Sequence, residues 1–450
     1  MVKYKHILAP GISEELVREI SEIKEEPKWM LDLRLNSYHE FSKKETPDWG
    51  YPYLSKDLDF SSFTYFLAPD SSKSENWEDL PEEIKNTYEA LKIPEVERKY
   101  LAGVVATYDS MPVISKIRSS LKDKGIIFTD IDTAIKEYPE LVQKYFMKAI
   151  PPSDNKLAAL HGAVWSGGTF LYVPPGVKVN LPLQSYFRIN SSQSGQFEHT
   201  IIVADKGSEL TYIEGCSAPH FTKGEKALHA GVVEVYVEDN AKVKFISVEN
   251  WSKNVYNLTT KRAIVKSNAY MEWIEATLGS KVSMLYPASY MRGDNSYTIN
   301  INLTIAPPNT WKDTGAKVLM SGSNNRAKLL SKSISIGNGV SVYRSLINVS
   351  PNSYNSIIYS QCDSLLSSKE SKAITIPHNE IRNDTTELHH EAYTGSISQE
   401  KLNYLMARGM NEEDAKSLLV LGFVEDILNN IPLEFSVEIA RLLKMQMMSG

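Results

Sequence analysis

Apolar and polar residues alternate along the middle of the chain. Between about residue 155 and residue 396 lie short runs such as "TIIVADKGSELTYIEG" and "GVVEVYVEDNAKVKFISVEN", separated by clusters of Gly, Asn, Asp, Ser or Pro. No helical pattern interrupts them, as a βαβ fold would require. The pattern therefore predicts an all-β core at 155–396, as a sandwich, a barrel or a solenoid. A solenoid suits this length best because stacked turns need no wider core, although no fixed repeat is evident.

The segments on either side of this core show helical patterns. Residues 1–154 predict a mainly helical N-terminal domain of helices and connecting loops, in which Ser13 caps a first helix. Pro81 and Pro94 stand where further helices would begin. "FTDIDTAIKEY" predicts a strand end followed by a capped helix.

Residues 397–450 predict a C-terminal helical domain. Ser398 and Asn411 are candidate N-caps, Gly409 ends the first helix, and a third helix is expected after Pro432. The apolar faces of these helices either pack together or dock a partner protein.

Composition narrows the class of protein. A chain of 450 residues with 42% hydrophobic and 23% charged residues predicts a globular protein of two or three domains. The net charge of −6 argues against non-specific nucleic-acid binding. We expect no membrane span, because no apolar run approaches ~20 residues, and a cytosolic (cytoplasmic) location, because the N-terminus lacks an apolar signal region.

The chain holds only two cysteines, Cys216 and Cys362. Two distant thiols make neither a disulfide framework nor a structural zinc site, and both should stay reduced in the cytosol. Phosphate-binding GxxxxGK[ST], hydrolase GxSxG and metalloprotease HExxH motifs are absent from the sequence.

A group of metal-ligating residue types follows the second cysteine. Cys362 lies in an alternating strand, and in the next strand His389 and Glu391 share one face while His390 opposes them. Thiolate, imidazole and carboxylate together suit a borderline-soft metal such as iron. The residues alone also allow a buried structural thiol and a solvated strand end.

Several segments resemble the SufB/SufD family of the SUF iron–sulfur cluster assembly system. They include "WSGGTFLYVPPGVKVNLPLQSYFRIN", "YIEGCSAPH", "SQCDSLL" and "HHEAYTGSISQEKLNYLMARGM", and the likeness runs from about residue 25 to residue 435. "WMLDLRL", the cysteine of "QCDSLL" and the glutamate of "HEA" favour SufB over SufD. The resemblance implies a right-handed parallel β-helix flanked by helical N- and C-terminal domains.

The resemblance also implies a function. SufB is an assembly scaffold, not an enzyme: it takes persulfide sulfur from a cysteine desulfurase and a SufE-type carrier and builds a nascent, transient Fe–S cluster. The ATPase SufC would dock on residues 397–450, and a SufD-type subunit or a second copy would pair with the chain. One alternative is a SufD-like structural subunit without cluster chemistry. Another is a carbohydrate-active β-helix enzyme, which would need a secretory signal and an acidic groove.

The resemblance assigns roles to individual residues. Cys216 would be the sulfur acceptor, and Cys362 the cluster-assembly thiolate, with His390 and Glu391 holding iron or lying opposite it across a subunit interface. The residues implied to line the sulfur path between the thiols are Arg188, Glu198, Trp251 and Lys261.

The sequence departs from the family pattern in three places. His389 stands where relatives often have glutamate, Glu249 stands where the path often has glutamine, and the N-terminal cysteine cluster of many SufB proteins is missing. The type of cluster, any need for reduced flavin in the complex, and the choice between SufD and a second copy as partner stay open.

Overall fold

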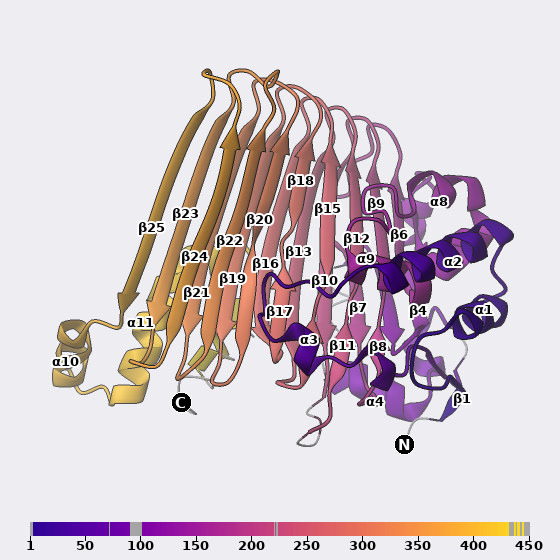
Figure 1. Cartoon of the computed structure of the whole chain (residues 1–450), viewed down its shortest axis with the longest axis horizontal. Helices are drawn as coiled ribbons and strands as arrows, with labels where there is room; N and C mark the ends of the chain where they lie inside the picture. Colours follow the sequence, from indigo (N-terminus) through magenta and orange to yellow (C-terminus); the bar gives the residue numbers. More distant parts are fainter. Residues whose placement is uncertain are drawn as a thin grey trace.

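In the computed structural model the middle of the chain winds into a parallel β-helix, with helices at both ends (Figure 1). The structure describes residues 3–71, 73–90, 101–219, 221, 224–431, 436–437, 439–441 and 443–444. Two sheets face each other, and successive turns of the chain add strands to each in alternation. The prediction of a mainly β protein with a parallel β-helix core is confirmed.

One sheet, called sheet I here, contains ten strands among the described residues, in the spatial order β4-β3-β7-β10-β13-β16-β19-β21-β23-β25. The β3–β4 pair is antiparallel, and the other neighbours are parallel. The strand bounds are β3 Gly103–Tyr108, β4 Met111–Ile117, β7 Leu183–Arg188, β10 Glu209–Ser217, β13 Lys242–Trp251, β16 Tyr270–Gly279, β19 Tyr297–Ala306, β21 Arg326–Ser335, β23 Ile357–Leu366 and β25 Glu387–Ser396.

The facing sheet, sheet II, has long strands at one end and broken strands at the other. Its main strands are β5 Ile127–Asp130, β6 Gly168–Val173, β9 His199–Ala204, β12 Val232–Val237, β15 Thr260–Val265, β18 Ala288–Met291, β20 Trp311–Met320, β22 Val340–Val349 and β24 Lys372–Ile381. Four short strands join it through β20, and they are β8 Gly195–Gln196, β11 Ala227–His229, β14 Val255–Asn257 and β17 Val282–Leu285. Strands β17 and β18 are separated by a break, but the strand of the next turn, β20, is continuous and pairs with both.

The turns of the β-helix repeat at uneven steps, which explains why the sequence shows no fixed period. Tyr270 pairs with Tyr297, Tyr297 with Arg326, and Arg326 with Ile357, which are steps of 27, 29 and 31 residues. Two residues before each of these strands an asparagine adopts a left-handed backbone conformation, at Asn268, Asn295, Asn324 and Asn355. Asparagine tolerates this conformation because its side chain can bond to the local backbone.

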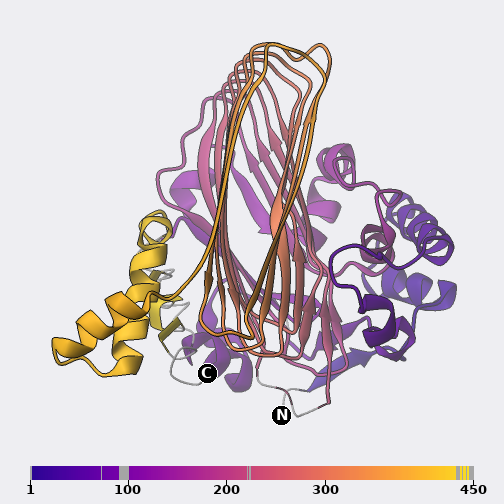
Figure 2. The ribbon, with the colours of Figure 1, turned by 60° about the vertical axis from the view of Figure 1, so that its left-hand side comes forward.

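Most helices of the N-terminal region cover the outer face of sheet II (Figure 2), whereas Ile84 of α4 packs against sheet I. The bounds are α1 Glu14–Ile23, α2 Lys28–Lys43, α3 Leu54–Asp57, α4 Glu82–Ala90, α6 Ser119–Lys122, α7 Ile131–Glu137, α8 Pro139–Tyr145 and α9 Lys156–Val164, with 3-10 turns at Phe60–Ser62 and Trp77–Asp79 and a separate antiparallel pair β1 Tyr4–Ile7 and β2 Leu67–Pro69. Ser13 caps α1, and Asp130 caps α7 directly after strand β5, as predicted. None of the described helices is long and apolar enough to cross a membrane.

The expectation of helices and loops alone for residues 1–150 was incomplete. Strands β3, β4 and β5 extend both sheets from within this region. The strands of the β3–β4 hairpin are short and were not recognised among the helical patterns of this region. The hairpin turns at Asp109, whose φ is 50°. The helix expected to start at Pro94 falls on residues 91–100, which lie outside the described residues.

The C-terminal helices lie on the opposite side of the molecule, against the outer face of sheet I (Figure 2). Ser398 caps α10 Gln399–Ala407, and Asn411 caps α11 Glu412–Leu428, as predicted. Val424 and Ile427 pack against strand residues such as Leu303. Most of the third helix expected after Pro432 lies outside the described residues. The limits proposed for the three domains, at 154 and 396, stay predictions.

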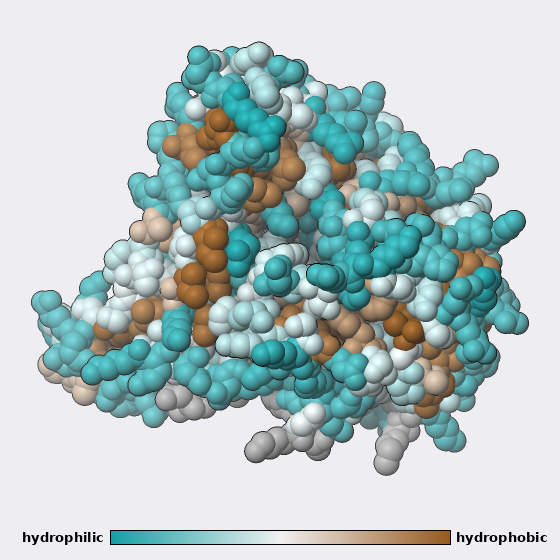
Figure 3. All heavy atoms as spheres, viewed as in Figure 1, coloured by the Kyte–Doolittle hydropathy of each residue, from teal (hydrophilic) through white to brown (hydrophobic). Residues whose placement is uncertain are grey.

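The outer face of sheet II is not fully covered. Figure 3 shows apolar areas among hydrophilic side chains on the face that Figure 1 presents. Ile374 and Ile376 on β24 are 39% and 37% exposed.

Candidate functional site

Both cysteines face the interior of the β-helix. Successive side chains of a strand point to opposite faces, so Cys216 on β10 shares the inner face with Tyr212 and Glu214. Cys362 on β23 shares the inner face with the buried Ser360, while the flanking residues face outward. The two thiols are 2% and 1% exposed.

A buried group of charged side chains lies beside Cys216. The Lys261 ammonium is 3.1 Å from Glu214 Oε1, 3.4 Å from Glu249 Oε1 and 3.1 Å from Glu275 Oε2, and all four side chains are almost fully buried. Glu249 stands directly beside Cys216 in the strand register. This arrangement, called the Lys261 cluster below, places three carboxylates around one cation.

The Lys261 cluster changes the acidity of its members. Burial raises the pKa of the Cys216 thiol well above its usual range, and nearby carboxylates, Glu214 first, raise it further. Burial also raises the pKa of Glu275 to about 8, although Lys261 opposes the shift. Burial by itself would lower the pKa of Lys261, but the carboxylates raise it well above the ordinary lysine value. The cluster therefore holds protons tightly, and Cys216 needs a base to become a thiolate.

A second buried pair adjoins the same thiol. Glu198 bonds to His229, whose Nδ1 is 2.7 Å from Asn257 Oδ1, and the His229 ring lies 4.5 Å from the Trp251 ring, centroid to centroid. Trp251 packs in the same apolar cluster as Cys216. Burial lowers the pKa of His229, but its interactions with Glu198, Glu249 and Asn257 together raise it above the usual histidine value.

Three of the four residues expected to line the sulfur path thus lie near Cys216: Glu198, Trp251 and Lys261. Arg188 lies elsewhere. It follows Phe187, which pairs with Cys216 on the inner face, so the Arg188 side chain is on the outer face, where Nη1 donates to Ser217 Oγ at 2.8 Å.

A continuous row of polar side chains leads along the inner face of sheet I from the Lys261 cluster to the second thiol. Each member is the register partner of the next across neighbouring strands, in the order Glu214, Ser247, Glu275, Asn302, Ser331 and Cys362. Five strand-to-strand steps of about 4.8 Å span roughly 24 Å. The β-helix interior is therefore apolar in part, and polar along the line that joins the thiols.

The row beside it is polar as well. Cys216 is followed in register by Glu249, Thr277, Thr304, Ser333 and Ser364. Thr304 bonds across the interior to Thr314 of sheet II at 2.8 Å, and Ser333 donates to Ser364 at 2.9 Å. Charged groups near Cys216 thus give way to hydroxyl and amide groups towards Cys362.

The structure does not bring the predicted iron ligands together within one chain. Cys362 pairs with Ala392 of β25, and its side chain points inward. Glu391 pairs with the exposed Gln361 and points outward, whereas His390 pairs with Ser360 on the inner face. The described residues contain no group of three or more His, Cys, Asp or Glu side chains placed to hold a metal ion.

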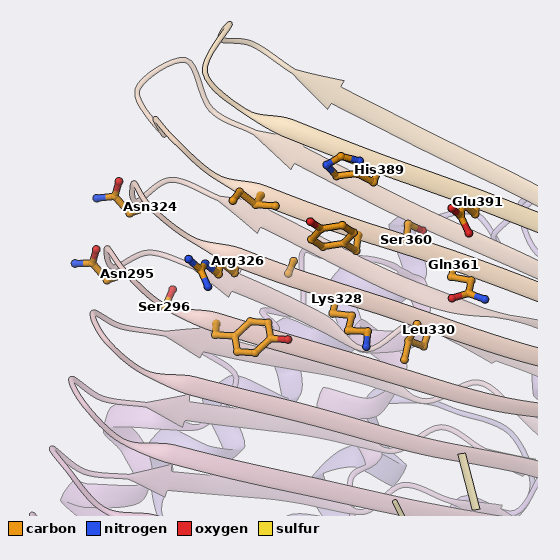
Figure 4. A pocket seen from close by; sticks show the side chains of 14 residues that line it. Asn295, Ser296, Asn324, Arg326, Lys328, Leu330, Ser360, Gln361, His389 and Glu391 are labelled. Atoms are coloured by element: carbon orange, nitrogen blue, oxygen red, sulfur yellow. The ribbon is translucent and has the colours of Figure 1, made fainter. Parts of the chain in front are cut away.

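A cavity of about 1040 Å³ lies on the outer face of sheet I, beside these residues (Figure 4). Glu391, Gln361 and His389 point into it from β23 and β25, and Arg326 and Lys328 of β21 line its other side. The His389 ring stacks on Tyr359 with centroids 4.7 Å apart. His389 is therefore on the face opposite to Cys362.

Sequence reasoning missed Glu214, Glu275 and His229 as site residues. Glu214 lies two residues before Cys216, so the strand alternation could have placed it on the same face. Glu275 and His229 depend on the register between turns, and the uneven steps conceal that register in the sequence.

The fold and site define a class: a β-helix protein with a polar interior line between two buried thiols. The profile described as SufBD protein N-terminal region matches residues 22–185, and the profile described as SUF system FeS cluster assembly, SufBD core domain matches residues 187–423. The chain belongs to the SufBD family of the SUF iron–sulfur cluster assembly system.

Curated relatives agree with this assignment over nearly the whole chain. Iron–sulfur cluster assembly SufBD family proteins of Staphylococcus saprophyticus, Staphylococcus haemolyticus and Staphylococcus aureus are each 44% identical over 437 residues, which is 97% of this chain and 93% of each relative. These matches do not separate SufB from SufD.

Proposed function

We propose that this chain is a SufB-type scaffold. It receives persulfide sulfur at Cys216, passes it through the β-helix interior to Cys362, and there builds a nascent iron–sulfur cluster as cargo. The observation that carries this proposal is the position of the chain's only two cysteines inside one β-helix, where Cys362 ends one polar row and Cys216 begins the polar row beside it.

The chemistry of the first step fits the surroundings of Cys216. A Cys216 thiolate attacks the sulfane sulfur of the donor persulfide; one S–S bond forms, the donor's S–S bond breaks, and the donor leaves as a thiol after taking a proton. Because burial disfavours the thiolate, a base must hold the thiol proton. Glu249 stands next to Cys216 in register and is the carboxylate we assign to this role.

The iron-binding part of the scaffold is proposed to be completed by a partner. Cys362 is one strand from the free edge of sheet I, and His390 and Glu391 lie on that edge strand. A SufD-type subunit or a second copy that pairs with β25 would bring its own side chains beside these three residues. Iron would then be held at the junction of two chains.

Cys216→Ser is expected to abolish persulfide labelling of this chain by a cysteine desulfurase with its SufE-type carrier. Assembly from free iron and sulfide should fall less than twofold, because Cys362 and the edge strand are unchanged. Persulfide-selective alkylation followed by mass spectrometry measures the first effect, and iron and sulfide content the second. Equal loss in both assays would show misfolding and contradict the assignment.

The same assays test the SufD-like alternative. A SufD-like subunit would gain no persulfide at either thiol and would bind no cluster that depends on Cys362, while still copurifying with the other subunits.

The exposed side of the C-terminal helices is the proposed docking face for a SufC-type ATPase. A cavity of about 420 Å³ along α11 and the loop before it is lined by Met410, Leu418 and Leu421, and Leu418 is 47% exposed. The chain lacks a phosphate-binding loop of its own, so the ATPase must come from a partner.

Leu418→Arg is expected to weaken binding of the SufC-type subunit at least tenfold without unfolding the chain. Deleting residues 397–450 is a poorer test, because α11 covers apolar residues of sheet I such as Leu303. Leu181→Arg is a matched control, since Leu181 is 37% exposed and precedes β7, away from α11. Copurification and titration calorimetry measure the effect, and unchanged binding would exclude this face.

A further inference from the structure

Hydroxyl groups surround the buried thiol of Cys362. Ser331 is its register partner on β21, and Ser360 and Ser364 precede and follow it on the same inner face. From the facing sheet, Thr375 Oγ1 lies 3.7 Å from Cys362 Sγ.

A fifth hydroxyl belongs to Tyr343. It is the register partner of Thr375 on β22, so both side chains face Cys362 from sheet II. Tyr343 is 3% exposed, and its ring and hydroxyl are close enough to Cys362 for the two to interact electrostatically.

Two of these hydroxyls lack a hydrogen bond of ordinary geometry. Tyr343 OH and Ser360 Oγ are buried and make none with any described residue, although they lie close enough to interact with each other. A buried hydroxyl without a well-formed hydrogen bond costs free energy, and such groups are uncommon in folded proteins. Two of them beside one thiol indicate a site shaped for a group that accepts hydrogen bonds.

The surroundings of the two thiols differ in kind. Cys216 has carboxylates and a lysine beside it, which bind and release protons. The inner-face register partners of Cys362 are Ser331 and Ala392, which carry no charge, and the titratable side chain on the same face is His390, the partner of Ser360. Ala392, at the free edge of sheet I, is the smallest side chain next to the thiol.

We propose that Cys362 holds sulfur as a persulfide before iron arrives, and that Tyr343, Ser360 and Thr375 bind its terminal sulfur by donating hydrogen bonds. The inference rests on the proposed function and adds the bound species and the residues that bind it. A terminal persulfide sulfur accepts hydrogen bonds from hydroxyls, and these donors offset part of the cost of burying its negative charge where no fixed cation lies beside it.

The step balances without an added oxidant. The Cys362 thiolate attacks the sulfane sulfur of an incoming persulfide, a new S–S bond forms on Cys362, the donor's S–S bond breaks, and the donor keeps that electron pair as a thiolate. The proton of the incoming persulfide passes to that thiolate. Cys362 then carries a negatively charged terminal sulfur, and the hydroxyls donate hydrogen bonds to it.

The test uses the full chain with both thiols present as the parent, with glutathione persulfide as the probe and no iron. The measured quantity is the equilibrium constant for sulfur exchange between glutathione and Cys362, from persulfide-selective alkylation and mass spectrometry of the peptide that carries Cys362, which is read separately from the peptide that carries Cys216. Tyr343→Phe should lower it about tenfold or more, since a hydrogen bond to a charged group contributes that much. Thr375→Val should lower it in the same direction.

Tyr212→Phe is the matched control. Tyr212 is also fully buried on the inner face with a hydroxyl that lacks a partner, but it lies in the N-terminal half of the β-helix. Its substitution should leave the exchange constant within twofold. If Tyr343→Phe and the parent have equal exchange constants, or if both tyrosine variants lower the constant equally, the proposal that these hydroxyls bind the persulfide is wrong. If the parent gains no persulfide at Cys362, both this proposal and the proposed sulfur route are wrong. Persulfide on the parent without later cluster assembly would overturn the scaffold function alone.

Discussion

Cys362→Ala is expected to reduce the iron and sulfide content of the purified complex to background while the chain stays folded. The variant removes the soft ligand that the proposed cluster requires, and no second cysteine lies near it. The fold should tolerate the change, because one small side chain is lost from a strand interior and its contact to Thr375 is 3.7 Å long. The expected cost in the free energy of unfolding is about 1 kcal/mol.

The measurement is iron and acid-labile sulfide per chain after anaerobic purification with the partner subunits coexpressed. Ser341→Ala is the control for a small inward-facing hydroxyl on the facing sheet. It loses hydrogen bonds with Ser335 at 2.9 Å and Ser333 at 3.2 Å, and should keep its cluster. Wild-type cluster content in Cys362→Ala would make Cys362 a structural thiol and remove the basis of the scaffold function.

Lys261→Met should destabilise the chain by about 3–5 kcal/mol, because breaking a buried ion pair leaves uncompensated charge. In Lys261→Met the three carboxylates of the Lys261 cluster lose their cation, and all three are buried between the two sheets. Chemical denaturation followed by circular dichroism measures the change in the free energy of unfolding.

Two further variants make this prediction specific to the buried cluster. Lys242→Met removes an exposed lysine that pairs with Glu209 at 3.1 Å, and it should cost less than about 1 kcal/mol. Adding Glu275→Gln to Lys261→Met should recover part of the lost stability, because one buried negative charge is removed. A loss below about 1 kcal/mol in Lys261→Met would show that the cluster is hydrated and only weakly coupled.

Alternation within a strand could be predicted from the sequence, and it correctly placed His389 and Glu391 on one face of β25 and His390 on the other. Pairing between strands could not be predicted in the same way. Glu275 joins the site because Ser247 pairs with Glu275 and Glu214 with Ser247. A shift of one residue in either pairing would turn Glu275 to the outer face, and the sequence alone does not fix that register.

One signal in the sequence does report the register. The asparagines at Asn268, Asn295 and Asn324 each precede a strand of sheet I by two residues and adopt the left-handed conformation. Aligning the turns on these asparagines, rather than searching for a constant period, would have brought Glu275 and Asn302 into one row. Arg188 shows the limit of family resemblance, since a single step of alternation puts it on the other face from Cys216.

The two ends of the β-helix differ, and this limits how chains can assemble. At the N-terminal end Ser74 bonds to the outer edge of β4, through Ser74 N to Val113 O at 3.0 Å and Ser115 N to Ser74 O at 3.2 Å. At the C-terminal end β24 and β25 have no neighbour on one side among the described strands, and their residues are largely exposed. Because each chain has one blocked end and one free end, its sheets can pair with only one other chain. When two chains pair by their free edges no free edge remains, so assembly stops at two chains and cannot continue into a fibre.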